Sequence, residues 1–343
     1  MAEWSDWYRR EDPTGWVLPR ILRARAEADP DRPYLRYEDG PWRSYGEVNA
    51  RANRVANALQ ARGVGRGECV STLLPNGEDH LPIWFGILKA GAVQSPINTA
   101  YVGDFLAWAL NLPQARFLVI ADSYLDRLAA IAGELPHLER VLVWSSGTPS
   151  GPDPAVAWEP VEALWEAGDG EPDVDVSWTD DARIMFTSGT TGRSKGVIKQ
   201  HASDYFSART YVEVCGVTAE DTAFSCLPLF HSNAQVLAAY PAMVAGARIV
   251  FAERYSSSRF WSQVVDAGAT VLNTVSAMNY FIWNTPQGPF DRAHTVSRIM
   301  AMPAPKDIYE PFEERFGIRF IEGYGLTETG MVTYQPPGVP PRP

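Results

Sequence analysis

Residues 184–198 read IMFTSGTTGRSKGVI, a loop of serine, threonine and glycine between two short apolar runs. The apolar runs predict two strands, and the loop between them predicts a turn. Glycines let backbone N–H groups approach an anion closely, hydroxyls add donors, and Lys195 adds a positive charge. The composition therefore predicts a phosphate-binding loop, although a solvent-exposed hairpin tip also fits it. It is not a Walker loop, which would need glycine and a hydroxyl where Ser194 and Gly196 stand.

A second stretch, residues 321–329, reads IEGYGLTET. Together with the first stretch, and in this order, it resembles the adenylate-forming superfamily of acyl-CoA synthetases, peptide-synthetase adenylation domains and luciferases. In that family the first motif lies along the ATP phosphates, and the second touches adenine and supplies a carboxylate to Mg²⁺. Ser194 stands where the family usually has proline, and we expect the loss of proline to loosen the loop without removing a phosphate donor.

The resemblance implies a role for each residue that matches the two motifs. The implied nucleotide-binding residues are Thr187, Ser188, Gly189, Thr190, Thr191, Gly192, Lys195, Gly323, Tyr324 and Gly325. Those of the first motif would hold the β- and γ-phosphates, and those of the second would bracket adenine. Thr327 would contact the α-phosphate, and Glu328 would bind Mg²⁺ through a hard oxygen ligand. Without the resemblance, Glu328 reads as a helix N-terminal carboxylate and Tyr324 as a core aromatic.

A histidine follows an apolar run in residues 227–231, which read LPLFH. A histidine in this setting is by itself more typical of a buried structural position than of a site. The family carries an aromatic–His pair here, so the resemblance places His231 at the acyl and nucleotide pocket, with Asn233 close by. We count His231 with Thr327 and Glu328 as candidate catalytic residues. No proton transfer is assigned to His231, because a carboxylate nucleophile is already ionised near neutral pH.

Residues 301–305 read AMPAP where the family usually has a small glycine-rich turn that lines the acyl pocket. Met302 and Pro303 replace two glycines, so we expect side-chain volume to intrude on the acyl pocket, and Pro303 removes a backbone donor. This departure argues against a generic fatty-acyl pocket, although plain core packing of Met302 is an alternative. Residues 255–274, taken with residues 230–231, resemble the carnitine/crotonobetaine-CoA ligase branch.

Strand-like and helix-like segments alternate along the chain, which predicts an α/β fold with largely parallel sheets and helices packed between and around them. At 343 residues the chain exceeds one typical domain, so two βα subdomains are expected, as in the N-terminal domain of adenylate-forming enzymes. We place subdomain A at about residues 67–212 and subdomain B at about residues 17–66 plus 213–343. Helices are expected over 124–135, 204–214 and 235–244, and surface loops over 145–154 and 167–174.

Composition and charge exclude several classes of protein. The formal net charge of −11, without a basic run, argues against a nucleic-acid or anionic-membrane partner. The three cysteines have no C-x-x-C spacing, so neither a disulfide framework nor a zinc site is indicated, and a reducing cytoplasm fits best. We find no signal-peptide pattern and no apolar run of the roughly 18 residues that a membrane helix needs, so no membrane association is expected. A homodimer remains compatible with the sequence.

The sequence stops at residue 343 in an irregular proline-rich tail, whereas family members continue. We therefore expect the C-terminal barrel and lid domain of the family to be absent. The resemblance implies attack of a carboxylate on ATP to give an acyl-adenylate and pyrophosphate, with Mg²⁺ as the metal. The acyl group would then pass to a thiol, most simply CoA, or to a carrier-protein thiol. The alternative is a catalytically silent module that binds nucleotide and acyl groups and needs a partner or the missing domain.

Overall fold

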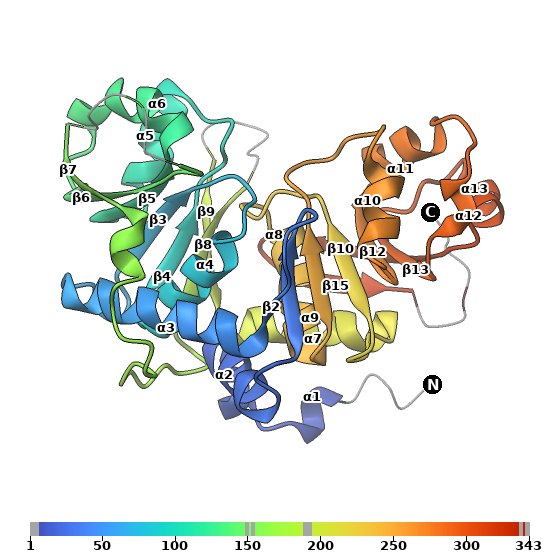
Figure 1. The fold of residues 1–343 in the computed structure, drawn as a ribbon, viewed down its shortest axis with the longest axis horizontal. Helices are drawn as coiled ribbons and strands as arrows, with labels where there is room; N and C mark the ends of the chain where they lie inside the picture. Colours follow the sequence, from blue (N-terminus) through green and yellow to red (C-terminus); the bar gives the residue numbers. More distant parts are fainter. Residues whose placement is uncertain (1–6, 148–150, 152–154, 188–193, 336–338, 340–343) are drawn as a thin grey trace.

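The computed structural model describes residues 7–147, 151, 155–187, 194–335 and 339. Two sheets stand side by side, and helices lie between them and on their outer faces (Figure 1). Parallel pairing dominates both sheets, and the antiparallel pairs are confined to their edges. This arrangement confirms the α/β fold that the alternation of strands and helices predicted.

The first sheet takes its strands from the middle of the chain. Its order is β7 (Ala157–Pro160), β6 (Arg140–Trp144), β5 (Phe117–Ala121), β3 (Cys69–Leu73), β4 (Val93–Pro96), β8 (Asp181–Phe186) and β9 (Gly196–Gln200). Strand β5 is buried along its whole length, as expected of a central parallel strand covered by helices on both faces. The last two strands, β8 and β9, form an antiparallel hairpin at one edge of this sheet.

The second sheet joins strands from both ends of the chain. Its order is β15 (Gly330–Tyr334), β14 (Arg319–Leu326), β13 (Arg298–Met302), β12 (Val271–Val275), β10 (Thr222–Ser225), β11 (Arg248–Phe251), β1 (Pro33–Tyr37) and β2 (Arg43–Ser44). Strands β14 and β15 form the antiparallel edge that carries the second motif. Both motif-bearing hairpins therefore lie at an edge of a sheet.

The helices divide between the space separating the sheets and their outer faces (Figure 1). They are α1 (Trp7–Arg10), α2 (Leu18–Ala28), α3 (Tyr45–Ala61), α4 (His80–Lys89), α5 (Gly103–Asn111), α6 (Leu125–Ala129), α7 (His201–Cys215), α8 (Ser232–Ala234), α9 (Tyr240–Ala245), α10 (Phe260–Asp266), α11 (Ser276–Trp283), α12 (Phe290–Ala293) and α13 (Tyr309–Phe316). One apolar cluster contains residues of α3, α4, α7 and α9 together with residues of both sheets. The two sheets therefore share a core, built from the helices between them.

Helix α3 shows how local sequence sets an element of this layer. Ser44 and Glu47 form a reciprocal capping box, in which the backbone N–H of Glu47 donates to Ser44 Oγ at 3.2 Å and the Ser44 N–H donates to Glu47 Oε2 at 2.7 Å. After the helix, Gly63 adopts φ +83°, which disfavours other residues. A Cβ on Gly86 of α4 would lie 2.3 Å from Cβ of Val55, so this glycine lets α3 and α4 pack closely.

Several elements differ from the sequence prediction. The helix expected over 124–135 is broken into α6 and short 3₁₀ turns at 122–124 and 132–134. The helix expected over 235–244 begins as a π-helical turn over residues 235–239 before α9. Strands β7 and β15 and helix α11 were not expected from the alternation. The predicted subdomain boundary at residue 212 falls inside α7, whose apolar residues belong to the shared core, so the division into subdomains stays a proposal.

Candidate functional site

The base of the β8–β9 hairpin carries the ends of the predicted phosphate loop. Phe186 pairs with Gly196, and the backbone N–H of Thr187 donates to the carbonyl of Lys195 at 3.1 Å. Thr187 is half-buried and Lys195 is exposed, so the lysine side chain is open to a ligand. The predicted phosphate ligands Ser188, Gly189, Thr190, Thr191 and Gly192 lie outside the described residues.

Ser194, which replaces the family's proline, is held in place by neighbouring aromatic side chains. Its Oγ shares a 2.7 Å hydrogen bond with the hydroxyl of Tyr101, and its carbonyl accepts from Trp108 Nε1 at 3.0 Å. The residue is buried, with 8% exposure. We expected the loss of proline to loosen the loop, but at Ser194 these two hydrogen bonds supply a restraint that a sequence pattern does not reveal.

The second motif runs along β14 and into its turn to β15. Gly325 pairs with Met331, and a Cβ on Gly325 would lie 2.3 Å from the carbonyl oxygen of Gly330, so only glycine allows this close pairing. Gly330 itself has φ +71°. The tight turn fixes where Thr327 stands. Gly323 is buried in the same strand.

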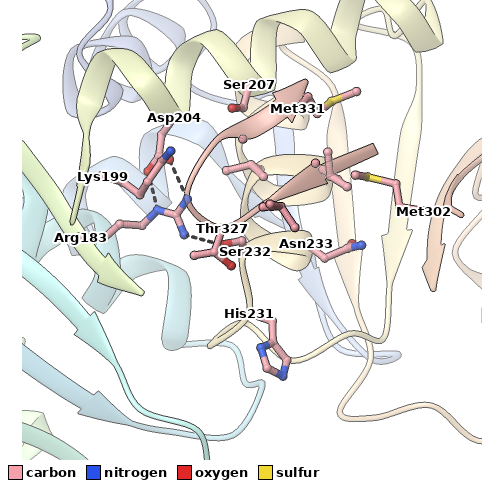
Figure 2. Close-up of a pocket in the computed structure, with 15 residues that line it drawn as sticks. Arg183, Lys199, Asp204, Ser207, His231, Ser232, Asn233, Met302, Thr327 and Met331 are labelled. Carbon is pink, nitrogen blue, oxygen red and sulfur yellow. Dashed lines mark hydrogen bonds and ion pairs between the residues drawn. The ribbon is translucent and has the colours of Figure 1, made fainter. Parts of the chain in front are cut away.

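A cavity of about 300 Å³ opens beside this turn (Figure 2). Its lining comes from β8, β9, α7, the segment from His231 to the π-helical turn, β13 and the β14–β15 turn. The lining residues are Arg183, Lys199, Asp204, Ser207, His231, Ser232, Asn233, Val236, Leu237, Met302, Gly325, Leu326, Thr327, Gly330 and Met331. Five of the predicted site residues, His231, Asn233, Met302, Gly325 and Thr327, therefore border one cavity.

The other predicted residues lie off this cavity. Tyr324 is 57% exposed on the sheet edge, and Glu328 is also exposed. Pro303, which follows a cis peptide bond, is exposed and does not line the cavity, so the volume expected to intrude comes from Met302 alone. The structure thus brings Gly325 and Thr327 of the second motif to the cavity and leaves Lys195 at the β8–β9 hairpin.

His231 stands at the lower rim of the cavity in Figure 2. Its ring centroid lies 4.5 Å from that of Phe230, so the predicted aromatic–His pair is in contact. Partial loss of solvent around the imidazole lowers the pKa of His231 below its ordinary value of 6.5. A neutral imidazole at this rim suits shaping of the pocket and hydrogen bonding better than holding a charge.

A buried ion pair on one wall of the cavity was not anticipated from the sequence. Arg183 and Asp204 are 1% and 0% exposed, and the guanidinium donates to both carboxylate oxygens, at 2.5 Å from Nε and 2.7 Å from Nη2. Burial disfavours the charged form of Arg183, but the Asp204 carboxylate outweighs it and raises the pKa of the guanidinium. In the sequence, the feature that could have indicated this ion pair is an arginine inside the otherwise apolar strand 182–186.

The same guanidinium ties strand β8 to the segment that follows His231. Arg183 Nη1 donates to Gln235 Oε1 at 2.6 Å and to Ser232 Oγ at 3.2 Å. Gln235 Nε2 donates in turn to the carbonyl of Leu229 at 2.6 Å. Figure 2 shows Arg183, Asp204 and Ser232 joined in this way. The π-helical turn, a feature frequent at functional sites, therefore begins at a residue of this network.

Two further polar side chains lie beside the pair. Lys199, 5% exposed, donates from Nζ to the backbone carbonyl of Glu328 at 3.2 Å, which links β9 to the second motif. Burial lowers the pKa of Lys199, while the Asp204 carboxylate opposes that change. His201 is 1% exposed, its Nδ1 has no hydrogen-bond partner among the described residues, and burial lowers its pKa to about 4.

Metal ligands are sparse in this part of the molecule. The described residues contain no group of three or more histidine, cysteine, aspartate or glutamate side chains arranged around a common point. Glu328, next to Thr327, offers one exposed carboxylate. Mg²⁺ commonly binds through one or two carboxylates and completes its shell with phosphate oxygens and water, so a single carboxylate here fits a magnesium–nucleotide complex. Among the described helices, none is long and apolar enough to cross a membrane.

The AMP-binding enzyme family model matches residues 22–343. Among curated proteins, the crotonobetaine/carnitine–CoA ligase of Salmonella heidelberg is 30% identical over 307 residues, and that of Salmonella paratyphi A is 32% identical over 301 residues. Each match covers 83% of this chain and 55% of the relative. The chain thus spans about half the length of the curated relatives it matches.

Solved structures share the arrangement of the two sheets. MatB from Rhodopseudomonas palustris matches with a TM-score of 0.82 and 26% identity, covering 96% of this chain and 63% of that one. The N-terminal domain of FACL13 from Mycobacterium tuberculosis matches with a TM-score of 0.79 and 25% identity, covering 91% and 76%. The anthranilate CoA ligase AuaEII, solved with anthranoyl-AMP, has a TM-score of 0.86 at 23% identity, covers 94% and 62%, and supports the fold alone.

Proposed function

Because the chain belongs to the AMP-binding enzyme family, we propose that it binds ATP and a carboxylic acid and joins them as an acyl-adenylate. The acid's carboxylate would attack the α-phosphate of ATP, forming a C–O–P link and releasing pyrophosphate. The acyl group would then pass to a thiol, with CoA as the acceptor, and AMP would leave. The reaction class is that of an acid–thiol ligase.

One observation carries the proposal. Residues of the second predicted motif and of the predicted acyl segments, which lie up to about a hundred residues apart in sequence, meet around one cavity. Thr327 borders it from the second motif, His231 and Asn233 from the segment after β10, and Met302 from the end of β13. A cavity in which polar groups converge beside apolar side chains is typical of a small-molecule site.

Positioning accounts for most of the chemistry that these residues would perform. The acid is already ionised near neutral pH, so the site needs no general base to create the nucleophile. Thr327 would hold the α-phosphate beside the carboxylate, and Thr187 and Lys195 would hold the β- and γ-phosphates. Holding both reactants in line and placing positive charge and donors where negative charge develops are the main contributions in phosphoryl-type transfer.

Glu328 is the residue that would hold Mg²⁺ in this site. Its carboxylate is exposed one residue beyond Thr327, and a hard oxygen ligand of this kind suits the ion. When bound, Mg²⁺ neutralises negative charge on the phosphate oxygens. The carbonyl of Glu328 accepts a hydrogen bond from the buried Lys199, so the backbone of the metal-binding residue is anchored from β9.

ATP–pyrophosphate exchange tests this function, because it requires only formation of the acyl-adenylate. The chain would be assayed with a panel of trimethylammonium, dicarboxylic, medium-chain and aryl acids. Exchange that depends on one acid would support the proposal and name the substrate class. A second candidate is a nucleotide- and acid-binding module that needs a partner, and the position of Lys195 and Glu328 outside the cavity favours it. Mg·ATP binding without exchange for any acid would support that candidate.

Calorimetry tests the nucleotide site separately from turnover. Lys195→Ala and Glu328→Ala are each expected to weaken Mg·ATP binding about tenfold or more, because each removes a charged contact to the phosphates or the metal. Lys306→Ala, at an exposed lysine outside the cavity, is the matched control and should leave the affinity unchanged. Unchanged affinity in both site variants would contradict the assignment of this nucleotide site.

A further inference from the structure

The cavity contains a buried cation without a counter-ion of its own. Lys199 is 5% exposed, and its ammonium has three N–H donors. One of them meets the carbonyl of Glu328 at 3.2 Å. Among the described residues, no carboxylate lies within ion-pair distance of its Nζ. Lys199 is also one of the residues that line the cavity.

The nearest buried acid is already committed to another cation. Both oxygens of Asp204 accept from Arg183, at 2.5 and 2.7 Å. Arg183, Lys199 and Asp204 lie together on one side of the cavity in Figure 2, and they leave this wall with one positive charge in excess. The Glu328 carboxylate also acts on Lys199, but it is exposed to solvent, which screens its charge.

An uncompensated buried ammonium is costly, and an anion brought by a ligand offsets that cost. The remaining wall combines apolar side chains, among them Val236, Leu237, Met302 and Met331, with polar side chains that bear no formal negative charge. The cavity therefore suits a ligand with an apolar linking segment and an anionic group that reaches Lys199. A cationic group near Lys199 would add repulsion and gain no counter-ion.

We propose that the acid accepted by this cavity carries a second anionic group, most simply a second carboxylate, and that Lys199 Nζ binds it. The inference rests on the proposed function, since it assumes that the first carboxylate is the one activated at Thr327. It names the substrate class as dicarboxylic acids with a short apolar linker. It also predicts that this cavity binds trimethylammonium acids poorly, because they carry a positive charge where the second carboxylate would lie.

Two matched ligand pairs test the charge preference in the unmodified chain. Glutarate is compared with its monoamide, glutaramate, which keeps the size and removes the second charge. γ-Trimethylammonio-butyrate is compared with its neutral tert-butyl isostere. Each is titrated by calorimetry at pH 7, with and without a saturating magnesium complex of α,β-methylene-ATP, so that the binding order does not decide the result. Glutarate is expected to bind about tenfold or more tightly than glutaramate, and the cationic acid more weakly than its isostere.

Variants then assign the preference to one side chain. Lys199→Met is expected to remove the preference for glutarate while leaving the affinity for glutaramate within about twofold. Lys306→Met removes an exposed lysine and should retain the full preference. An equal loss for both acids would mean that Lys199 holds the reacting carboxylate. A loss confined to the nucleotide would mean that Lys199 serves the nucleotide, by holding a phosphate or through its hydrogen bond to the Glu328 carbonyl. Either result overturns the inference.

The outcomes separate this inference from the function on which it rests. Acid binding without a charge preference in the unmodified chain overturns the inference alone, whatever the folding of the Lys199 variant. Exchange activity with a monocarboxylic acid and none with dicarboxylic acids has the same meaning. No binding by any acid overturns the proposed function and the inference together.

Discussion

Separating Arg183 from Asp204 is expected to be among the more costly changes at the cavity wall. The pair is almost fully buried, and the guanidinium also donates to Gln235 and Ser232. Removing one partner leaves a buried charge without compensation, which costs about 3–5 kcal/mol of unfolding free energy. We therefore expect Asp204→Leu and Arg183→Met each to lose that amount.

The double variant should lose far less than the two single variants together. With both charges gone, the main remaining penalty is the buried Gln235 Oε1 without its donor, about 1–3 kcal/mol. The coupling energy between the two positions is then at least about 3 kcal/mol in magnitude. Urea unfolding followed by tryptophan fluorescence measures it, because the chain has 12 tryptophans and a midpoint shift at constant slope reports stability.

An exposed pair of the same chemistry provides the control. Arg20 and Asp175 are joined at 2.7 Å, but their side chains are 50% and 93% exposed. Arg20→Met and Asp175→Leu should each change stability by no more than about 1 kcal/mol, because solvent screens the pair. If the buried single variants cost as little as this control, or if their costs simply add in the double variant, the reasoning from burial is wrong.

Three other changes have expected outcomes. Neutral His201 has a pKa of about 4 in the native chain and an ordinary value of 6.5, so its stabilising effect is complete above pH 6.5. This contribution to the free energy of unfolding falls by about 3 kcal/mol as the pH drops to 4. In urea unfolding measured across this pH range, His201→Gln should therefore lose about 3 kcal/mol less stability than the unmodified chain. Gly325→Ala should destabilise the chain by about 1–3 kcal/mol, since its Cβ would lie 2.3 Å from the Gly330 carbonyl, whereas Gly15→Ala, with open space around it, should have little effect in the same assay. Met302→Ala should raise the affinity for acids with bulkier linkers relative to glutarate in calorimetry, because Met302 lines the cavity, and an unchanged ranking would place its side chain away from the acid.

The sequence predicted the elements whose signals are local. The helix expected over residues 204–214 is present as α7. Helix α3 shows why local signals suffice, because its capping box and the glycine that follows it lie within about twenty residues. The helix expected over residues 124–135 was wrong as a continuous element. The pattern of apolar residues there fits a helix, but the turns of 3₁₀ helix on either side of α6 depend on how the segment packs on the first sheet.

For the site, too, the sequence indicated some residues and not others. The order and composition of the two motifs indicated the residues for nucleotide binding, and Thr327 and Gly325 do border the cavity. Arg183, Lys199 and Asp204 were not singled out, because each is an ordinary charged residue in the sequence. Lys199 follows Arg183 across the hairpin and Asp204 lies in α7, so their grouping depends on strand pairing and on the packing of a helix.

By itself, the sequence determined the class of fold, the family and the candidate nucleotide-binding residues, because periodicity and short motifs depend on residues that are close together in the sequence. Only the tertiary structure decided which charges are buried, which of them neutralise one another and which one faces the cavity. Burial and distance are properties of residues brought together from β8, β9, α7 and the β14–β15 turn. Where the cavity wall is buried and has a low dielectric constant, the burial of charged side chains and the distances between them decide which charge on a ligand is favourable.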